Sequence, residues 1–271
     1  MKTPLVSSKW LFENLNHPDL IILDASVKKV TENQDKTIDN TQIKGARFFD
    51  LKNKFSDKAA DLPNTFPSVT QFESEAQKLG INNNSLIVVY DNLGIYSAPR
   101  VWWMFKTMGH QNVVVLNGGL PEWISQGYPT EEKQSQQYKS GNFKAEFNSK
   151  RVKNYELIKS NLNNDSNLVV DARSEGRYNG TAPEPRDGLR SGSIPNSANI
   201  PFGNVLENGK FKSKEELKAI FSKINAENKE LTYSCGSGLT ACIILLASEL
   251  VLPNKTAVYD GSWTEWATIE K

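Results

Sequence analysis

The sequence predicts an α/β protein made of two tandem domains, each with a mainly parallel β-sheet flanked by helices. Short, β-branched apolar runs alternate with helical patterns, as expected of strands that are covered on both faces. These runs also occur twice along the chain, in the same order. The length of 271 residues exceeds what one hydrophobic core usually serves. We therefore expect two separate cores.

Three pairs of segments carry the internal repeat. IILDA (21–25) matches LVVDA (168–172), LIVVYD (86–91) matches ELTYSC (230–235), and VVVLNGGLPEW (113–123) matches TAVYDGSWTEW (256–266). The offsets are 147, 144 and 143 residues. Such a near-constant spacing over three blocks indicates a tandem duplication.

The polar segment EEKQSQQYKSGNFKAEFNS (131–149) lies between the two copies and lacks helical or strand periodicity over most of its length. It is predicted to be a linker. We therefore expect an N-terminal domain at 1–130 and a C-terminal domain at 150–271.

The composition excludes several classes of function. A net charge of +1 gives no bias toward nucleic acid or membrane. The N-terminus lacks the features of a signal or transit peptide, and no apolar run is long enough for a transmembrane helix, so we expect a cytoplasmic protein. The two cysteines, Cys235 and Cys242, form neither a disulfide framework nor a metal cluster. No metal or organic cofactor is implied.

The segment YSCGSGLTAC (233–242) is the strongest functional signal. Cys235 ends a predicted strand, and apolar residues at helical spacing follow from Leu239 onward. Gly236 and Gly238 allow the backbone to curl, so that successive N–H groups can converge on the Cys235 sulfur as an anion-binding nest. Together with the helix N-terminus, such a nest favours a thiolate. The loop is therefore predicted to make a nucleophile, although a buried structural cysteine remains the alternative.

Two other interpretations of the loop are weaker. Cys242 lies on the apolar face of the predicted helix, where core packing explains it. A cysteine phosphatase would need an arginine six residues after the cysteine to grip phosphate, and that position is Ala241. Attack at sulfur fits the loop better than attack at phosphorus.

The motifs together resemble a known family. CGSGLT (235–240), DGSWTEW (260–266) and DARSEGRYNGTAPEPRDG (171–188) are similar to segments of the two-domain rhodanese-type sulfurtransferases. The resemblance covers essentially the whole chain and implies two tandem rhodanese-like domains. Residue Asp91 stands where the first copy would carry the cysteine, and a carboxylate cannot carry sulfur. The resemblance therefore implies a catalytically silent N-terminal domain.

Within the family, the neutral loop resembles that of the enzymes that act on 3-mercaptopyruvate, whereas thiosulfate enzymes tend to have cationic residues after the cysteine. Thiosulfate is a dianion and gains from nearby cations. The resemblance implies that Arg177 and Arg186 hold the carboxylate and ketone of the donor. They lie in a Pro- and Gly-rich loop on the same side of the sheet as the Cys235 loop.

The predicted reaction is transfer of a sulfane sulfur from 3-mercaptopyruvate, through a persulfide on Cys235, to a thiol such as a thioredoxin-like protein or to cyanide, with release of pyruvate. Ser237 would donate a proton or a hydrogen bond, and Thr240 would brace the loop at the helix start. The expected site is listed by residue: Cys235, Ser237, Arg177, Arg186, Gly236, Gly238, Leu239 and Thr240. A thiosulfate sulfurtransferase and a persulfide carrier or partner-binding module with little turnover remain alternatives.

The chain departs from the mercaptopyruvate branch at a proton relay. Asn64 stands where the family has a histidine, and Lys52 stands where it has an aspartate. The two histidines of the chain, His17 and His110, lie in a turn and at a helix end, and both are predicted to be structural. Ser237 is thus left without an evident base.

Overall fold

The computed structural model describes residues 3–27 and 40–270. These residues fold into two compact units. Unit 1 contains Met1–Asp57, Phe66–Phe147 and Asn208–Lys210, as far as they are described. Unit 2 contains Lys58–Thr65, Asn148–Glu207 and Phe211–Lys271, again as far as they are described. A short segment of the N-terminal half, Lys58–Thr65, therefore belongs to the unit that contains Cys235.

Unit 1 is built on a five-stranded parallel sheet. In spatial order its strands are β1 (Leu5–Val6), β6 (Val113–Leu116), β5 (Leu86–Tyr90), β2 (Leu20–Asp24) and β4 (Arg47–Phe48). A separate antiparallel pair joins β3 (Thr41–Ile43) to β7 (Thr130–Glu132). The predicted strands at 21–25, 86–91 and 113–116 all form, because continuous Val, Ile and Leu runs suit strands buried on both faces.

Unit 2 repeats this sheet with the same topology. In spatial order its strands are β8 (Val152–Lys153), β14 (Thr256–Tyr259), β13 (Glu230–Ser234), β9 (Asn167–Asp171) and β10 (Ala198–Asn199). The three central strands, β9, β13 and β14, occupy the places of their partners from the sequence repeat, β2, β5 and β6. A short two-stranded pair, β11 (Leu206–Glu207) with β12 (Lys210–Phe211), completes the strands of the described chain. The identical strand order confirms the predicted fold of two similar α/β domains.

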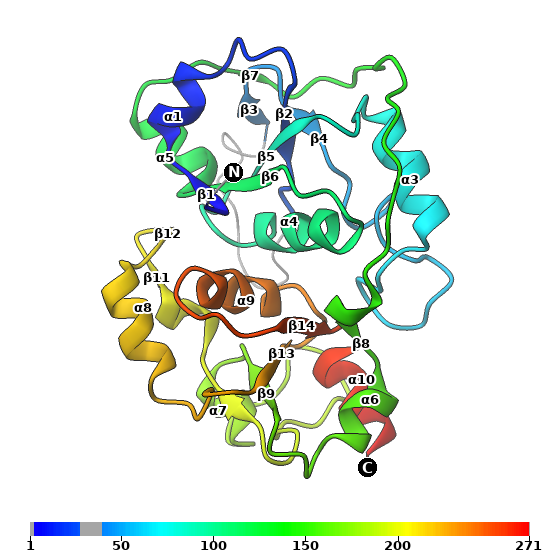
Figure 1. The fold of residues 1–271 in the computed structure, drawn as a ribbon, viewed down its shortest axis with the longest axis vertical. Coiled ribbons are helices and arrows are strands. Elements are labelled where there is room, and N and C mark those ends of the chain that lie inside the picture. Colours follow the sequence, from blue (N-terminus) through cyan, green and yellow to red (C-terminus); the bar gives the residue numbers. More distant parts are fainter. Residues whose placement is uncertain (1–2, 28–39, 271) are drawn as a thin grey trace. The chain divides into compact units, whose positions relative to one another are not determined.

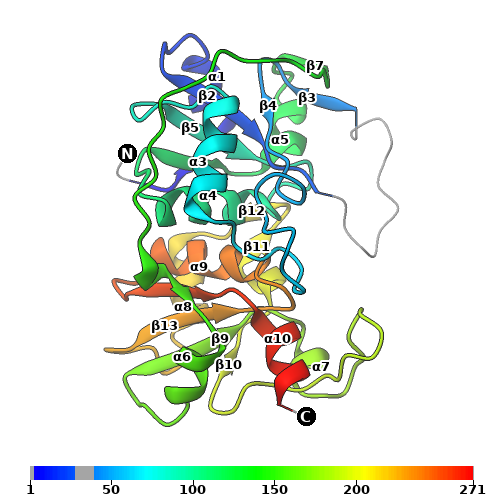
Figure 2. The same cartoon turned by 90° about the vertical axis from the view of Figure 1, so that its right-hand side faces the viewer.

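The helices also correspond between the units. Those of unit 1 are α1 (Ser8–Glu13), α3 (Val69–Lys78), α4 (Ala98–Thr107) and α5 (Gly119–Ser125). Those of unit 2 are η1 (Ser149–Arg151), α6 (Tyr155–Ser160), α7 (Glu175–Tyr178), η2 (Phe202–Val205), α8 (Lys214–Phe221), α9 (Ala241–Glu249) and α10 (Ser262–Ile269). Within unit 2, α9 lies on one face of the sheet, and α6 and α10 lie on the other (Figures 1 and 2).

Local sequence signals explain why several helices begin where they do. Ser7 caps α1 and Asn154 caps the equivalent helix α6, each by accepting a hydrogen bond from a backbone N–H in the first turn. Ser213 and Glu216 form a complete capping box at the start of α8. Helix ends fixed in this way hold the connecting loops at the sheet edge in place.

Residues 131–149, predicted to be the linker, carry more structure than a polar linker needs. Phe143 is only 1% exposed, and its backbone N–H donates to the Ile81 carbonyl of unit 1. Gln77 of α3 donates from its side-chain amide to the Phe143 carbonyl at 2.9 Å. One buried aromatic ring with its backbone paired is sufficient to order a polar segment. The domain boundaries at 1–130 and 150–271 stay predictions.

Within residues 3–27 and 40–270, none of the helices has both the length and the apolarity needed to cross a bilayer.

Candidate functional site

Cys235 lies at the carboxyl end of β13, a central strand of the unit 2 sheet. Its loop runs from 236 to 240, and α9 begins at Ala241, directly after Thr240. The Cys235 side chain is 2% exposed. Ligands of open α/β sheets bind at this end of the strands. The structure therefore places the cysteine where the repeat and the glycines predicted a site.

The first turn of α10 holds the two carbonyl groups that begin the loop. Trp263 N–H donates to the Cys235 carbonyl at 2.9 Å. Thr264 donates to the Gly236 carbonyl twice, from its N–H at 3.1 Å and from its Oγ1 at 2.6 Å. In a trans peptide the C=O and the N–H point in opposite directions. The N–H groups of Gly236 and Ser237 are thus directed away from α10.

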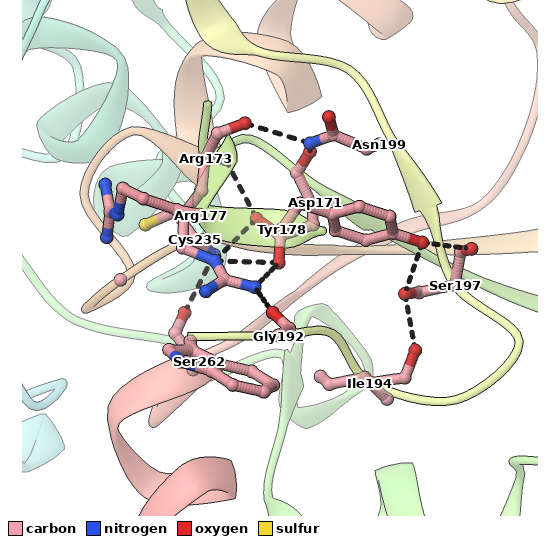
Figure 3. Close-up of polar contacts among 12 residues, drawn as sticks. Asp171, Arg173, Arg177, Tyr178, Gly192, Ile194, Ser197, Asn199, Cys235 and Ser262 are labelled. Carbon is pink, nitrogen blue, oxygen red and sulfur yellow. Dashed lines mark hydrogen bonds and ion pairs between the residues drawn. The ribbon is translucent and has the colours of Figure 1, made fainter. Parts of the chain in front are cut away.

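Ser262 fixes the cysteine backbone from the same helix end. Its Oγ accepts a hydrogen bond from Cys235 N–H at 3.2 Å (Figure 3). The same Oγ donates to the Tyr259 carbonyl at 2.8 Å. Ser262 has φ = 52°, a left-handed conformation that side chains other than glycine and asparagine seldom adopt. Gly119 occupies the equivalent position in unit 1 and has the same φ of 52°. A serine is retained here in a conformation that suits glycine.

Unit 1 shows what this kind of loop binds. Asp91 directly follows β5, as Cys235 follows β13, and it is completely buried. Its carboxylate accepts four backbone hydrogen bonds at 2.8–3.0 Å, from Leu93, Tyr96, Ser97 and Ala98. Burial raises the pKa of Asp91 above its ordinary value, and the four N–H groups act against this rise. The loop of unit 1 is therefore an anion-binding nest built around residue 91.

One backbone contact of the Asp91 loop recurs in unit 2. Leu120 N–H donates to the Asp91 carbonyl at 3.0 Å, as Trp263 N–H donates to the Cys235 carbonyl. Leu93, whose N–H reaches the Asp91 carboxylate, is two residues past Asp91, as Ser237 is two residues past Cys235. From this equivalence we infer that the N–H group of Ser237 faces the side chain of residue 235.

Two arginines meet at the Cys235 loop. A Cβ atom on Gly236 would lie 3.1 Å from Nη2 of Arg177 and 3.9 Å from Nη1 of Arg186. Arg177 comes from α7, and Arg186 from the Pro-rich loop after it. The structure thus brings both predicted arginines to one glycine of the loop. The backbone of Gly236 does not adopt the left-handed φ expected of it, and a Cβ there would make a tight contact with the flexible end of Arg177.

A buried ion-pair network positions Arg177. Both Nε and Nη2 of Arg177 donate to Glu184 Oε2, at 3.1 and 2.5 Å. The other oxygen of Glu184 accepts from Arg173 Nη1 at 2.6 Å, and Arg173 also donates to both carboxylate oxygens of Asp171. The side chains of Arg173 and Glu184 are 0% and 1% exposed. Burial raises the pKa of Asp171, and Arg173 opposes that rise.

Figure 3 shows the part of this network around Asp171 and Arg173, beside the cysteine. Arg173 reaches the Gly192 carbonyl as well as Asp171, and Asn199 donates to the carbonyls of Asp171 and Arg173. The Arg173 guanidinium also lies over the Trp263 ring, 4.3 Å from the ring centroid. Every polar partner of Arg173 is therefore fixed by the fold, which favours a structural role for it.

Asn64 contacts Ser237, although the two residues are 173 positions apart in the sequence. Its Nδ2 donates to Ser237 Oγ at 3.1 Å and to the Ser237 carbonyl at 3.4 Å. Asn64 has φ = 59°, which asparagine tolerates better than most residues. The structure thus places Asn64 next to Ser237, as its alignment with the family's histidine implies. Lys52 is exposed in unit 1.

The remaining predicted site residues have mixed outcomes. Gly238 adopts φ = 77°, which confirms the need for glycine there. Leu239 and Thr240 end the loop, and Thr240 is the N-cap of α9. Its side chain makes no capping hydrogen bond, so the prediction that its hydroxyl braces the helix start is wrong. The hydroxyl that braces the loop belongs to Thr264.

The residues predicted to be structural have core contacts. Cys242 is fully buried in α9, and its Sγ lies 3.5 Å from the Gly238 carbonyl. His110 is buried in unit 1 with Nε2 2.9 Å from the Ser85 carbonyl. His17 accepts a hydrogen bond from Asp19 N–H in a turn. In the described ranges, no group of three or more His, Cys, Asp or Glu side chains is arranged to hold a metal ion.

Sequence reasoning missed three residues of the site: Glu184, Ser262 and Thr264. Glu184 lies between Arg177 and Arg186 in the sequence, and this position could have indicated a carboxylate that pairs with a site arginine. Ser262 and Thr264 lie in the repeat block DGSWTEW, which was treated as evidence for the duplication alone. Their contacts with the cysteine loop depend on the parallel alignment of β13 with β14.

Comparison with known proteins shows which family the chain resembles. Residues 7–126 and 154–269 each match the rhodanese-like domain. The chain is 40% identical over 272 residues to 3-mercaptopyruvate sulfurtransferase of Mus musculus, covering 97% of this chain and 91% of that protein. It is 42% identical to thiosulfate sulfurtransferase of Bos taurus, with the same coverage.

Solved structures show the same fold. SseA from Escherichia coli, a 3-mercaptopyruvate sulfotransferase, superposes with a TM-score of 0.85 at 33% identity, covering 97% of this chain and 99% of SseA. Tum1 from Saccharomyces cerevisiae gives a TM-score of 0.89 at 28% identity, covering 99% and 96% of the two chains. With matching domains in both halves and relatives similar over nearly their full length, this chain belongs to the rhodanese family.

Proposed function

We propose that the protein is a sulfurtransferase that takes a sulfane sulfur from 3-mercaptopyruvate and carries it as a persulfide on Cys235. The observation that carries this proposal is the convergence of Arg177 and Arg186 on Gly236, next to a loop whose unit 1 counterpart binds an anion. A nucleophilic sulfur and a receptor for a small anionic donor are thus adjacent. Sulfurtransferases are named among the relatives similar over nearly the full chain.

The reaction has two half-reactions. The Cys235 thiolate attacks the thiol sulfur of the donor, so an S–S bond forms and the donor C–S bond breaks. The electron pair of that bond leaves on carbon as the enolate of pyruvate, which is protonated to pyruvate. In the second half-reaction an acceptor thiolate attacks the outer sulfur of the persulfide, forms its own S–S bond and releases the Cys235 thiolate.

The loop backbone supports both anionic states of the sulfur. The N–H groups of Gly236 and Ser237, directed away from α10, would donate to the thiolate and to the persulfide. Ser237 would supply a hydroxyl to the developing enolate. Since Asn64 donates to Ser237 Oγ, the serine's own proton is directed toward another acceptor. Gly238, Leu239 and Thr240 would complete the curl of the loop.

The charge around the loop favours a donor with one carboxylate. Arg173 and Arg177 are paired with the two carboxylates of Asp171 and Glu184, so the charges of this network cancel. Arg186, which donates to Thr264, brings one positive charge to the loop, and the loop residues 236–240 add none. A monoanionic carboxylate is matched by one positive charge, whereas thiosulfate, a dianion, is not. Arg177 and Arg186 would hold the carboxylate and the ketone.

The unit that carries Asp91 would be catalytically silent, because a carboxylate fills the nest that holds the thiol in unit 2. The acceptor would be a thiol, either a small molecule or a thioredoxin-like protein, with cyanide as an in vitro substitute. A cytoplasmic location stays a prediction from the N-terminal sequence.

Steady-state kinetics with the two donors test the proposal. We expect kcat/KM for 3-mercaptopyruvate to exceed that for thiosulfate by at least about tenfold, with pyruvate formed in proportion to sulfur transferred. The Cys235→Ser variant should lose both activities. A higher kcat/KM for thiosulfate would establish the second candidate function, a thiosulfate sulfurtransferase, which the bovine relative's name favours. A folded protein that turns over neither donor would overturn the proposal.

A further inference from the structure

Thr264 connects Arg186 to the cysteine loop. Its Oγ1 accepts a hydrogen bond from Arg186 Nη1 at 2.8 Å and donates to the Gly236 carbonyl at 2.6 Å. The roles of donor and acceptor follow from the partners, because a guanidinium only donates and a carbonyl only accepts. The single hydroxyl proton of Thr264 is therefore committed to the loop.

This chain of hydrogen bonds ends at the peptide unit that joins Gly236 to Ser237. The Gly236 carbonyl and the Ser237 N–H belong to one peptide unit, so holding the carbonyl fixes the direction of the N–H. The positive charge of Arg186 polarises the Thr264 hydroxyl, and hydrogen bonds in a chain strengthen one another. Arg186 is thus linked electronically and sterically to the backbone donor of Ser237.

The silent unit lacks this link. Pro121 occupies the position of Thr264 in the repeated block, since NGGLPEW aligns with DGSWTEW. Proline has neither a hydroxyl nor an N–H to donate. The equivalent of Ser262, which holds the Cys235 N–H, is Gly119. Both hydroxyls that contact the loop from α10 therefore occur only in the unit that carries the cysteine.

We propose that Thr264 is a positioning residue that couples donor binding to the geometry of the cysteine loop. When the donor's carboxylate engages Arg186, Thr264 keeps that guanidinium and the Ser237 N–H in a fixed relation, so the bound donor sulfur meets an aligned Cys235. This inference rests on the proposed function, because it assumes an anionic donor at Arg186.

Two substitutions separate the hydroxyl from the shape of the side chain. Thr264→Val keeps the branched shape and the N–H bond to the Gly236 carbonyl but removes both hydrogen bonds of the hydroxyl. We expect KM for 3-mercaptopyruvate to rise and kcat to fall, each about tenfold. Thr264→Ser keeps the hydroxyl and should restore both values to within about threefold of wild type. The matched control is Thr268→Val, one turn further along α10, where an exposed threonine donates only to the Thr264 carbonyl. Its kinetics should equal those of wild type.

A double-mutant cycle tests whether Thr264 acts through Arg186. In an Arg186→Met background, Thr264→Val should raise KM by less than about twofold, because the contact that it removes is already gone. Full additivity of the two changes in KM would overturn the coupling, as would a Thr264→Val enzyme with wild-type kinetics.

A second readout does not depend on turnover. The rate at which iodoacetamide alkylates Cys235 should change at least about twofold in Thr264→Val and return to the wild-type rate in Thr264→Ser. If wild type turns over no donor but these alkylation rates differ as expected, the proposed function fails and the loop-positioning role stands. If wild type turns over the donor and the alkylation rates are equal in all three proteins, the positioning role fails alone.

Discussion

Asn64 Nδ2 donates a hydrogen bond to Ser237 Oγ at 3.1 Å, so an amide stands beside the hydroxyl that follows Cys235 by two residues. The neighbouring Ser237 carbonyl, 3.4 Å from the same nitrogen, can only accept, which fixes the orientation of the amide. An amide orients a hydroxyl but exchanges no proton with it in the ordinary pH range. The position therefore orients Ser237 without serving as a base.

Replacing Asn64 with histidine should introduce an ionisation that the wild type lacks at this position. We expect the kcat profile of Asn64→His with 3-mercaptopyruvate to show an added inflection near pH 6.5, the ordinary imidazole pKa. Asn64→Ala should lower kcat about two- to tenfold, because the hydroxyl loses its partner. A histidine variant whose profile superimposes on that of wild type, together with full activity in the alanine variant, would show that Asn64 has no part in the reaction.

Glu184 holds two arginines with its two carboxylate oxygens, and its loss should affect both stability and donor binding. Glu184→Gln removes the charge between Arg173 and Arg177 while keeping the size of the side chain. We expect the free energy of unfolding to fall by about 3 kcal/mol, since the buried Arg173 keeps only Asp171 and Arg177 loses its carboxylate, and KM for 3-mercaptopyruvate to rise. Urea unfolding and steady-state kinetics measure the two effects.

The control is Glu175→Gln, an exposed glutamate at the start of α7. Its stability and KM should stay close to wild type. Equal, small effects of both variants would contradict the positioning role of Glu184.

Asp91 should matter for folding and not for sulfur transfer. Asp91→Asn replaces a carboxylate that accepts four backbone hydrogen bonds with an amide, whose NH₂ group cannot accept a hydrogen bond. We expect a loss of about 2–4 kcal/mol in the free energy of unfolding and persulfide formation per folded molecule equal to wild type. Loss of persulfide formation in the folded variant would show that this unit takes part in the reaction.

His110 predicts a loss of stability on the acid side of neutrality. Burial lowers the pKa of His110 below its ordinary value, so the folded chain keeps the imidazole neutral where the unfolded chain protonates it. The unfolded state then binds more protons, and stability falls as the pH drops below about 6.5 toward the lowered folded pKa. Comparison of urea midpoints at pH 7.5 and 5.5 measures this loss.

His110→Gln can still donate to the Ser85 carbonyl and does not titrate, so its midpoint should vary less between the two pH values. The only other histidine, His17, is exposed in a turn, and His17→Gln serves as the matched control variant. An equal pH dependence in wild type and His110→Gln would contradict this account.

The repeat carried most of the fold prediction. Because β-branched runs recur at constant spacing, the central strands and their parallel arrangement could be derived before any coordinates. The short edge strands β4 and β10 have two residues each and no periodic pattern, so nothing local marks them. Residues 131–149 were harder still, since their order depends on the burial of Phe143 against unit 1.

Some residues of the site could also be predicted from the sequence, and others could not. The sequence predicted Cys235 and its glycines because these residue types are typical of a reactive loop. It predicted the two arginines because the family resemblance gave them a role. Thr264 and Ser262 carry no such signal, since their function comes from hydrogen bonds that form only when α10 is placed against β13. Thr240 was assigned the bracing role because it stands at the helix start, yet its hydroxyl makes no capping bond.

The central claim is that Cys235 carries sulfur, and intact mass measurement tests it most directly. One equivalent of 3-mercaptopyruvate, mixed with enzyme in the absence of an acceptor, should add one sulfur atom to the chain and release one pyruvate. Cys235→Ser should gain nothing, whereas Cys242→Ser, which alters the only other cysteine, should gain as wild type does. An unmodified wild-type chain, or a sulfur atom that survives in Cys235→Ser, would contradict the account.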